Sequence, residues 1–133
     1  MTGDFRKLQV WEKAHALASR IDRMATAIRL TRYSALRSQL TRAAMSIPAN
    51  IAEGRRQSGE KEFARFLRYA VNSAYELEYH LVVAQDIGVV PEAEVQASLA
   101  DLIQVRKMIH GLLRKLGEAT EPPEGGNHRV VVG

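Results

Sequence analysis

The chain has 133 residues, a net charge of +4 and no cysteine. This length fits one domain whose core is large enough to fold without disulfides or a structural metal. The absence of cysteine excludes disulfides, thiolate metal sites and a cysteine nucleophile, and it is compatible with a cytoplasmic location. The N-terminus has no secretory signal, and no stretch approaches the ~18 uninterrupted apolar residues of a membrane span.

The charge is unevenly distributed along the chain. Residues 1–60 carry 11 Lys or Arg and 5 Asp or Glu, whereas residues 61–133 carry 8 and 10. Between Arg20 and Arg68 the basic excess reaches +7. A segment with this excess would attract a polyanion.

Three of four predicted helices have a heptad-like amphipathic pattern, and they cover residues 5–30, 58–87 and 91–116. Apolar residues recur there at alternating intervals of four and three. The third helix, about 28 residues, would be ~42 Å long and ends at Gly88. The fourth opens at Pro91, has Ser98 as the one polar residue of its seam, and is closed by Gly117. The seams consist of Val10, Ala14, Leu17, Ile21, Met24 and Ile28; Phe63, Leu67, Ala70, Ala74, Leu77, Leu81 and Ala84; and Val95, Leu102, Val105, Ile109, Leu112 and Leu116.

The remaining predicted helix covers residues 34–53. Ser34 is a candidate N-cap, and Gly54 is a candidate C′ residue that would end the helix in a left-handed conformation. Pro48 lies inside the pattern and removes a backbone donor, so we expect a kink or a break there. Ser58 is the candidate N-cap of the helix that follows.

Short links join these helices at residues 31–33, 55–57 and 89–90, and short links connect antiparallel neighbours. The sequence therefore predicts an all-α protein, an antiparallel up-and-down four-helix bundle over residues 1–117. The last stretch, residues 118–133, has two prolines, three glycines and three acids, a composition typical of a disordered tail.

The run Gln39-Leu40-Thr41-Arg42-Ala43-Ala44-Met45-Ser46-Ile47-Pro48-Ala49-Asn50-Ile51-Ala52-Glu53-Gly54 resembles the signature of the "four helix bundle protein" family. Leu8-Gln9-Val10-Trp11 and Phe66-Leu67 also fit, and the matching pieces span most of residues 8–116. That family includes proteins encoded in intervening sequences of bacterial large-subunit ribosomal RNA genes, and accessory variability determinant proteins of diversity-generating retroelements. The resemblance implies a ring-like homo-oligomer, a pentamer, with nucleic-acid contact for some members and no assigned catalytic activity.

Two functions are consistent with these features. The first is an oligomeric scaffold that binds RNA or DNA through arginines, which suit bidentate phosphate contacts. The alternative is a protein–protein adaptor, whose partner in the retroelement relatives would be a reverse transcriptase. For a single bundle, a solvated surface with ordinary ion pairs would also account for the charges. The candidate nucleic-acid ligands are Arg29, Arg32, Arg37, Arg42, Arg55, Arg56, Lys61, Arg65 and Arg68, with Arg55 and Arg56 expected in the loop before the third helix.

The signature run has a structural interpretation rather than a catalytic one. Ser46 lacks a nucleophile motif and a nearby histidine, so it is not predicted to be a nucleophile. Pro48 would free a carbonyl one turn back, and Ser46 or Asn50 could bond at that irregularity. We expect this segment to form core and subunit interface, and Glu53 to have a basic ion-pair partner. The motif residues are Ser46, Ile47, Pro48, Asn50, Glu53 and Gly54.

No catalytic, cofactor or metal site is predicted. Glu76 and His80 are spaced i, i+4 rather than as the Glu-x-x-His of carboxylate-bridged metal bundles. His110 could approach His80 across an antiparallel hairpin, but two histidines are too few to indicate zinc. The aromatic residues of the third helix could stack on bases, although packing is the default expectation.

Overall fold

The computed structural model describes residues 4–118. It contains four α-helices: α1 (Gln9–Thr26), α2 (Ser34–Arg56), α3 (Glu60–Ile87) and α4 (Glu92–Lys115). Two short 3₁₀ turns, η1 (Phe5–Lys7) and η2 (Thr31–Tyr33), precede α1 and α2. No strand occurs within these residues. The predicted all-α class and the four helices are confirmed.

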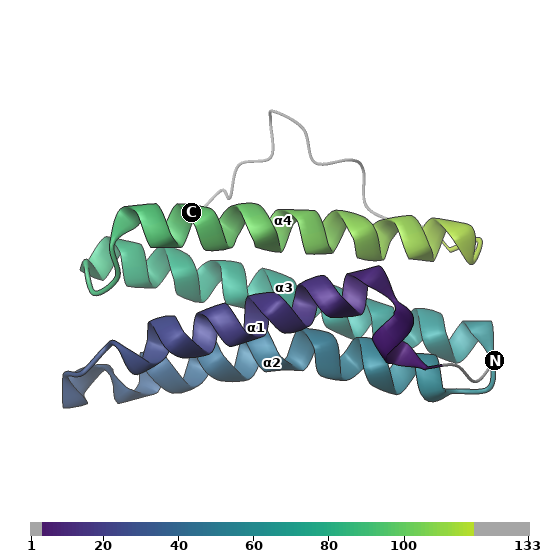
Figure 1. The fold of residues 1–133 in the computed structure, drawn as a ribbon, viewed down its shortest axis with the longest axis horizontal. Coiled ribbons are helices and arrows are strands. Elements are labelled where there is room, and N and C mark those ends of the chain that lie inside the picture. The colour runs from purple at the N-terminus through teal and green to yellow at the C-terminus, as the bar shows by residue number, and fades with distance from the viewer. Residues whose placement is uncertain (1–3, 119–133) are drawn as a thin grey trace, which may run out of the picture.

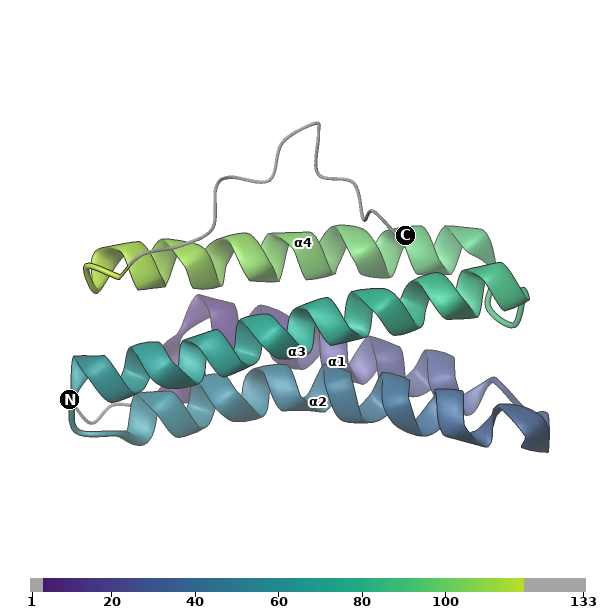
Figure 2. The same ribbon diagram turned by 180° about the vertical axis from the view of Figure 1, so that it is seen from behind.

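The helices run alternately up and down, and consecutive helices are neighbours (Figures 1 and 2). Each helix packs against two others, with α1 also closing on α4. One end of the bundle holds the α1–α2 and α3–α4 connections. The other end holds the α2–α3 connection, η1 and the end of α4 (Figure 1). This arrangement determines which charged residues share an end.

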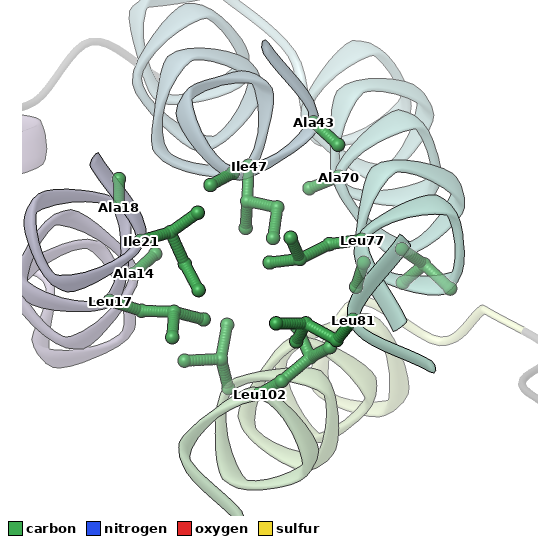
Figure 3. Close-up of a cluster of buried hydrophobic side chains, with 14 of the residues drawn as sticks. Ala14, Leu17, Ala18, Ile21, Ala43, Ile47, Ala70, Leu77, Leu81 and Leu102 are labelled. Atoms are coloured by element: carbon green, nitrogen blue, oxygen red, sulfur yellow. The ribbon is translucent and has the colours of Figure 1, made fainter. Parts of the chain in front are cut away.

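The core is formed mainly by the predicted seams; in the fourth helix Leu112 and Leu116 are only partly buried, and Leu113, which was not predicted, is buried beside them. Leu17 and Ile21 of α1, Ile47 of α2, Leu77 of α3 and Leu102 of α4 point into one shared interior (Figure 3). Every seam residue predicted for the first and third helices is buried. Burial of these apolar stripes is the main favourable term in the stability of such a bundle.

The first helix is shorter than predicted at both ends. Leu8 has extended backbone angles, which separate η1 from α1, and Asp4 caps η1 by accepting a hydrogen bond from the Arg6 N–H at 3.0 Å. At the other end, α1 stops at Thr26, although Ile28 is still buried. The periodic pattern continues past the helix because the corner folds back onto the same core.

The second helix is longer than predicted and passes through Pro48 without a break. Ile47 and Ile51 are both fully buried, so core packing on either side of the proline holds the helix together despite the missing donor. The prediction that Gly54 is a C′ residue is wrong. Gly54 lies inside α2, which continues to Arg56, so Arg55 and Arg56 are helical rather than in a loop.

The predicted serine N-caps are also wrong, whereas the glycine stops are confirmed. Tyr33 and Gly59 occupy the cap positions of α2 and α3, and neither makes a side-chain cap bond. Gly88 and Gly117 have φ of 83° and 76°, the left-handed region in which glycine is favoured. The predicted tail lies outside the described residues except for Glu118, whose backbone N–H donates to the Leu113 carbonyl at 2.9 Å.

Candidate nucleic-acid interface

The predicted basic residues do not form one continuous surface. Arg29, Arg32 and Arg37 lie at the α1–α2 corner, at the opposite end of the bundle from the α2–α3 connection (Figure 1). Arg42 lies between the two ends, on α2. Since α2 has 23 residues, the two ends are separated by about 35 Å. The remaining five residues of the set gather at the α2–α3 end: Arg55, Arg56, Lys61, Arg65 and Arg68.

The α2–α3 end has a positive charge that the other end lacks. We define this basic end as residues 4–7, 53–68 and 114–118, which contain nine basic and five acidic residues, a net charge of +4. The opposite end, residues 22–37 and 86–94, contains four of each. The sequence analysis did not include four basic residues of the α2–α3 end. In an antiparallel bundle the start of the first helix and the end of the fourth lie at the same end as the α2–α3 connection, so the predicted topology could have identified them: Arg6, Lys7, Arg114 and Lys115.

Two of the arginines at the α2–α3 end differ sharply in environment. Arg56 is exposed, with Nη1 3.8 Å from the Glu53 carboxylate, which gives Glu53 a basic partner as predicted. Arg55 is half-buried, and its guanidinium lies 6.0 Å from the centre of the Phe63 ring. Arg56 is therefore accessible to a ligand, whereas Arg55 also packs on the core.

Along α3, Arg65 lies within a compact group of charged and aromatic side chains. It forms two hydrogen bonds to the Glu62 carboxylate, at 2.7 and 3.2 Å, and donates a third to the Tyr69 hydroxyl at 3.0 Å. The hydrogen bonds to Glu62 and Tyr69 raise the pKa of Arg65 above its usual value. Arg65 therefore keeps its positive charge at every physiological pH. Arg68 pairs with Glu118, which brings the end of α4 next to α3.

Other predicted arginines are engaged in the fold. Arg37 donates from Nη1 to the carbonyls of Ile28 and Leu30, at 2.8 and 3.0 Å, and so satisfies the backbone of the α1–α2 corner. Arg42 bridges to Glu76 on α3 at 3.0 Å. These contacts give both residues a structural role.

The signature segment forms the seam between α2 and α3. Ser46 Oγ and Ser73 Oγ are 2.7 Å apart, and Asn50 Nδ2 donates to the Ser46 carbonyl at 2.8 Å and to its hydroxyl at 3.0 Å. A Cβ on Gly54 would lie 2.8 Å from Phe66 Cβ, so glycine permits the close approach of the helices. The segment's unusual composition therefore serves the packing of α2 on α3.

A groove of about 570 Å³ lies between α1 and α2, on the outer side of the signature segment. Trp11 stacks on His15 with ring centres 4.8 Å apart, and Phe5 packs edge-on against Trp11. Met45, 48% exposed, lines the opposite wall with Pro48. The groove is mainly apolar and open to solvent.

No group of three or more histidine, aspartate or glutamate side chains that could hold a metal occurs in the part of the chain described. Burial lowers the pKa of His80, Arg42 lowers it further, and Glu76 opposes both effects. Its ring contacts Tyr79 edge-on at 5.6 Å. Within residues 4–118, no helix is both long enough and apolar enough to cross a membrane.

Four antiparallel helices with a small-residue seam between the second and third define a four-helix bundle protein. The chain belongs to the 23S rRNA-intervening sequence protein family, which it matches over residues 6–111. This confirms the resemblance noted in the sequence.

The fold is also that of a solved protein of unknown function from the S23 ribosomal protein family of Bacteroides thetaiotaomicron. The two structures superpose with a TM-score of 0.74 at 22% sequence identity, covering 79% of this chain and 98% of the other. Among curated proteins there is no significant sequence match.

Proposed function

We propose that this protein is a non-catalytic, self-associating scaffold that binds RNA through the α2–α3 end of the bundle. The observation that carries the proposal is the +4 charge of that end beside a neutral opposite end. Basic residues gathered on one face are the electrostatic footprint of a nucleic-acid-binding protein. The α2–α3 connection brings together arginines from α2 and α3, which favour bidentate phosphate contacts.

The ion pairs at this end do not compete strongly with a phosphate ligand. Arg56 and Arg65 each pair with a glutamate three residues away on the same helix, and these side chains are about half exposed. Exposed pairs of this type stabilise a protein by about 0.2–1 kcal/mol. Since phosphate contacts also release counterions, they can replace such pairs at low salt.

RNA is the first ligand to test because the family is named for intervening sequences of 23S rRNA. A fluorescent RNA oligonucleotide titrated with the protein at several salt concentrations measures the binding directly. We expect the affinity to fall steeply with salt, since the binding is electrostatic. Absence of binding at low salt would refute the proposal.

A charge-matched pair of variants tests the location. Arg56→Glu with Lys61→Glu reverses two exposed charges at the α2–α3 end, and we expect affinity to fall about tenfold or more at low salt. Arg29→Glu with Arg32→Glu makes the same charge change at the opposite end and should have a much smaller effect. Equal losses in the two variants would place the binding elsewhere. Arg55 is left unchanged because it packs against Phe63.

The α1–α2 groove favours a second property, self-association into a ring-like homo-oligomer. Its apolar wall includes the exposed Met45 and lies beside small residues that allow close approach. A ring would repeat the basic end once per subunit and multiply weak phosphate contacts. A pentamer is the assembly implied by the family resemblance.

Light scattering at several concentrations tests this assembly. We expect a mass well above the 14.8 kDa of one chain, and a lower mass for Met45→Glu. Val82→Glu is the matched control, because Val82 is 40% exposed on α3, away from the groove. A monomeric wild-type protein would contradict self-association. It would favour the adaptor function, in which a different protein occupies the groove.

A further inference from the structure

Tyr69 lies at the surface of α3, directly after the last α3 residue of the basic end, and two neighbours contact its ring. Its residue is 40% exposed, and its ring meets Phe66 edge-on, with centres 5.5 Å apart and planes at 85°. The Arg65 guanidinium carbon lies 5.0 Å from the centre of the Phe66 ring and 5.6 Å from that of Tyr69. We call Arg65, Phe66 and Tyr69 the Tyr69 cluster.

The position of the cluster follows from the register of α2 on α3. Arg42 pairs with Glu76, Ser46 with Ser73, and Gly54 approaches Phe66, so the antiparallel register brings Asn50 opposite the turn that carries Tyr69. The cluster therefore borders the seam on its solvent side. Arg68, the residue preceding Tyr69, adds a further cation.

The described contacts of Tyr69 lie on the outer side of α3. Its hydroxyl accepts a hydrogen bond from the exposed Arg65, and its ring meets the half-buried Phe66 edge-on. An aromatic ring fixed beside guanidinium groups is the arrangement on which unpaired bases stack, because every base has a π-face and every nucleotide a phosphate.

We propose that the Tyr69 cluster stacks on an unpaired base, so that the ligand of the basic end is single-stranded RNA. This inference rests on the function proposed above. In a duplex the faces of the bases are covered by their neighbours, and a protein reaches only the phosphates, the 2′-hydroxyls and the base edges. Single-stranded RNA offers both phosphates to the arginines and base faces to Tyr69.

The test compares a labelled single-stranded oligouridylate with a labelled RNA duplex of the same number of phosphates, at the same series of salt concentrations. We expect the single strand to bind more tightly. Tyr69→Ala should weaken binding of the single strand about tenfold and leave that of the duplex unchanged. It should also leave the salt dependence unchanged, because no phosphate contact is removed.

Three further variants serve as controls. Tyr69→Phe keeps the stacking ring and should bind like the wild type. Tyr69→Leu retains apolar contact with Phe66 and should show the same loss as Tyr69→Ala, which separates stacking from a packing defect. Tyr79→Ala removes a tyrosine on the same helix that is 65% exposed and lies towards the other end, and it should have no effect.

The possible failures are distinguishable. If single strand and duplex bind equally, and Tyr69→Ala binds both as well as the wild type, the stacking inference is overturned. The proposed function then stands provided that Arg56→Glu with Lys61→Glu still weakens binding of both. If neither RNA binds the wild-type protein at low salt, both the inference and the proposed function fail.

Discussion

Gly54 of α2 lies directly against Phe66 of α3, with no room for a side chain between them. A Cβ at Gly54 would lie 2.8 Å from Phe66 Cβ, 3.0 Å from Phe63 Cδ1 and 3.3 Å from the Phe63 carbonyl oxygen. Two of these atoms, Phe66 Cβ and the Phe63 carbonyl oxygen, are fixed close to or within the backbone, so a rotamer change cannot make room. Gly54 is therefore a packing residue within a helix, and the large side chains opposite it belong to the α3 turn beside the basic end.

Gly54→Ala is predicted to destabilise the protein by about 1–3 kcal/mol, because overpacking forces the two helices apart. The intrinsic helix propensity of alanine, about 1 kcal/mol better than glycine, only partly offsets this cost. Gly111→Ala in α4 is the matched control, since a Cβ there meets only Arg114 Nη2 at 3.9 Å. Urea unfolding should show Gly111→Ala stabilised and Gly54→Ala destabilised; the same sign for both would contradict the packing argument.

Arg106 joins α4 to α3 from a buried position. It is 3% exposed, donates to Glu78 Oε1 at 2.9 Å and lies 4.3 Å from the centre of the Tyr75 ring. Arg106→Ala should cost about 3 kcal/mol, because Glu78 loses a buried partner and the stacking on Tyr75 is lost. Arg20→Ala removes an exposed pair with Asp101 between α1 and α4, and it should cost no more than about 1 kcal/mol. Comparable losses in urea unfolding would argue against the buried pair's importance.

Most of the fold could be predicted from sequence because the seams are continuous. In α3, the residues from Phe63 to Ala84 keep one spacing, and each of them is buried. What the pattern cannot show is contact between helices. The residues around Gly54 in the sequence are compatible both with a glycine that ends a helix and with a glycine packed inside one. Only its contact with Phe66 of α3 distinguishes the two.

The candidate site was predicted less well, for a related reason. Counting charges along the sequence placed Arg29 and Arg56 in one basic segment, although the antiparallel fold places them at opposite ends of the bundle. It also missed Arg6 and Lys115, which come from the two ends of the described chain and join the α2–α3 end only through topology. The sequence pattern did not indicate that Arg106 pairs with Glu78. Position 106 lies beside the apolar seam of α4 and leaves its spacing intact, so the pattern gives no reason to expect a buried charge there.

His80 should make stability depend on pH. Burial lowers its pKa in the folded protein, so the unfolded chain takes up the proton first as the pH falls through about 6.5. The folded state then loses stability relative to the unfolded state, whereas above that pH both are neutral at this residue. Urea unfolding at pH 7.5 and pH 5.5 should show a smaller loss for His80→Gln than for the wild type. Identical losses would show that His80 titrates alike in both states.

Asn50, beside the α2–α3 seam, acts as a hydrogen-bond donor: its Nδ2 donates to the Ser46 carbonyl at 2.8 Å. Asn50→Asp substitutes a carboxylate oxygen for that donor and brings two acceptors together in a half-buried site. We expect a destabilisation of about 1–3 kcal/mol at pH 7. The deficit should shrink below about pH 4, where a protonated aspartate can donate again.

Asn72→Asp, at an exposed position of α3, provides the control, because it makes the same chemical change in solvent. It should leave the free energy of unfolding nearly unchanged at pH 7. Urea unfolding at pH 7 and pH 3.5 distinguishes the two positions: only Asn50→Asp should approach the wild-type stability on acidification. A deficit in Asn50→Asp that persists at pH 3.5 would mean that the carboxyl shape, rather than its lost proton, disturbs the seam formed with Ser46 and Ser73.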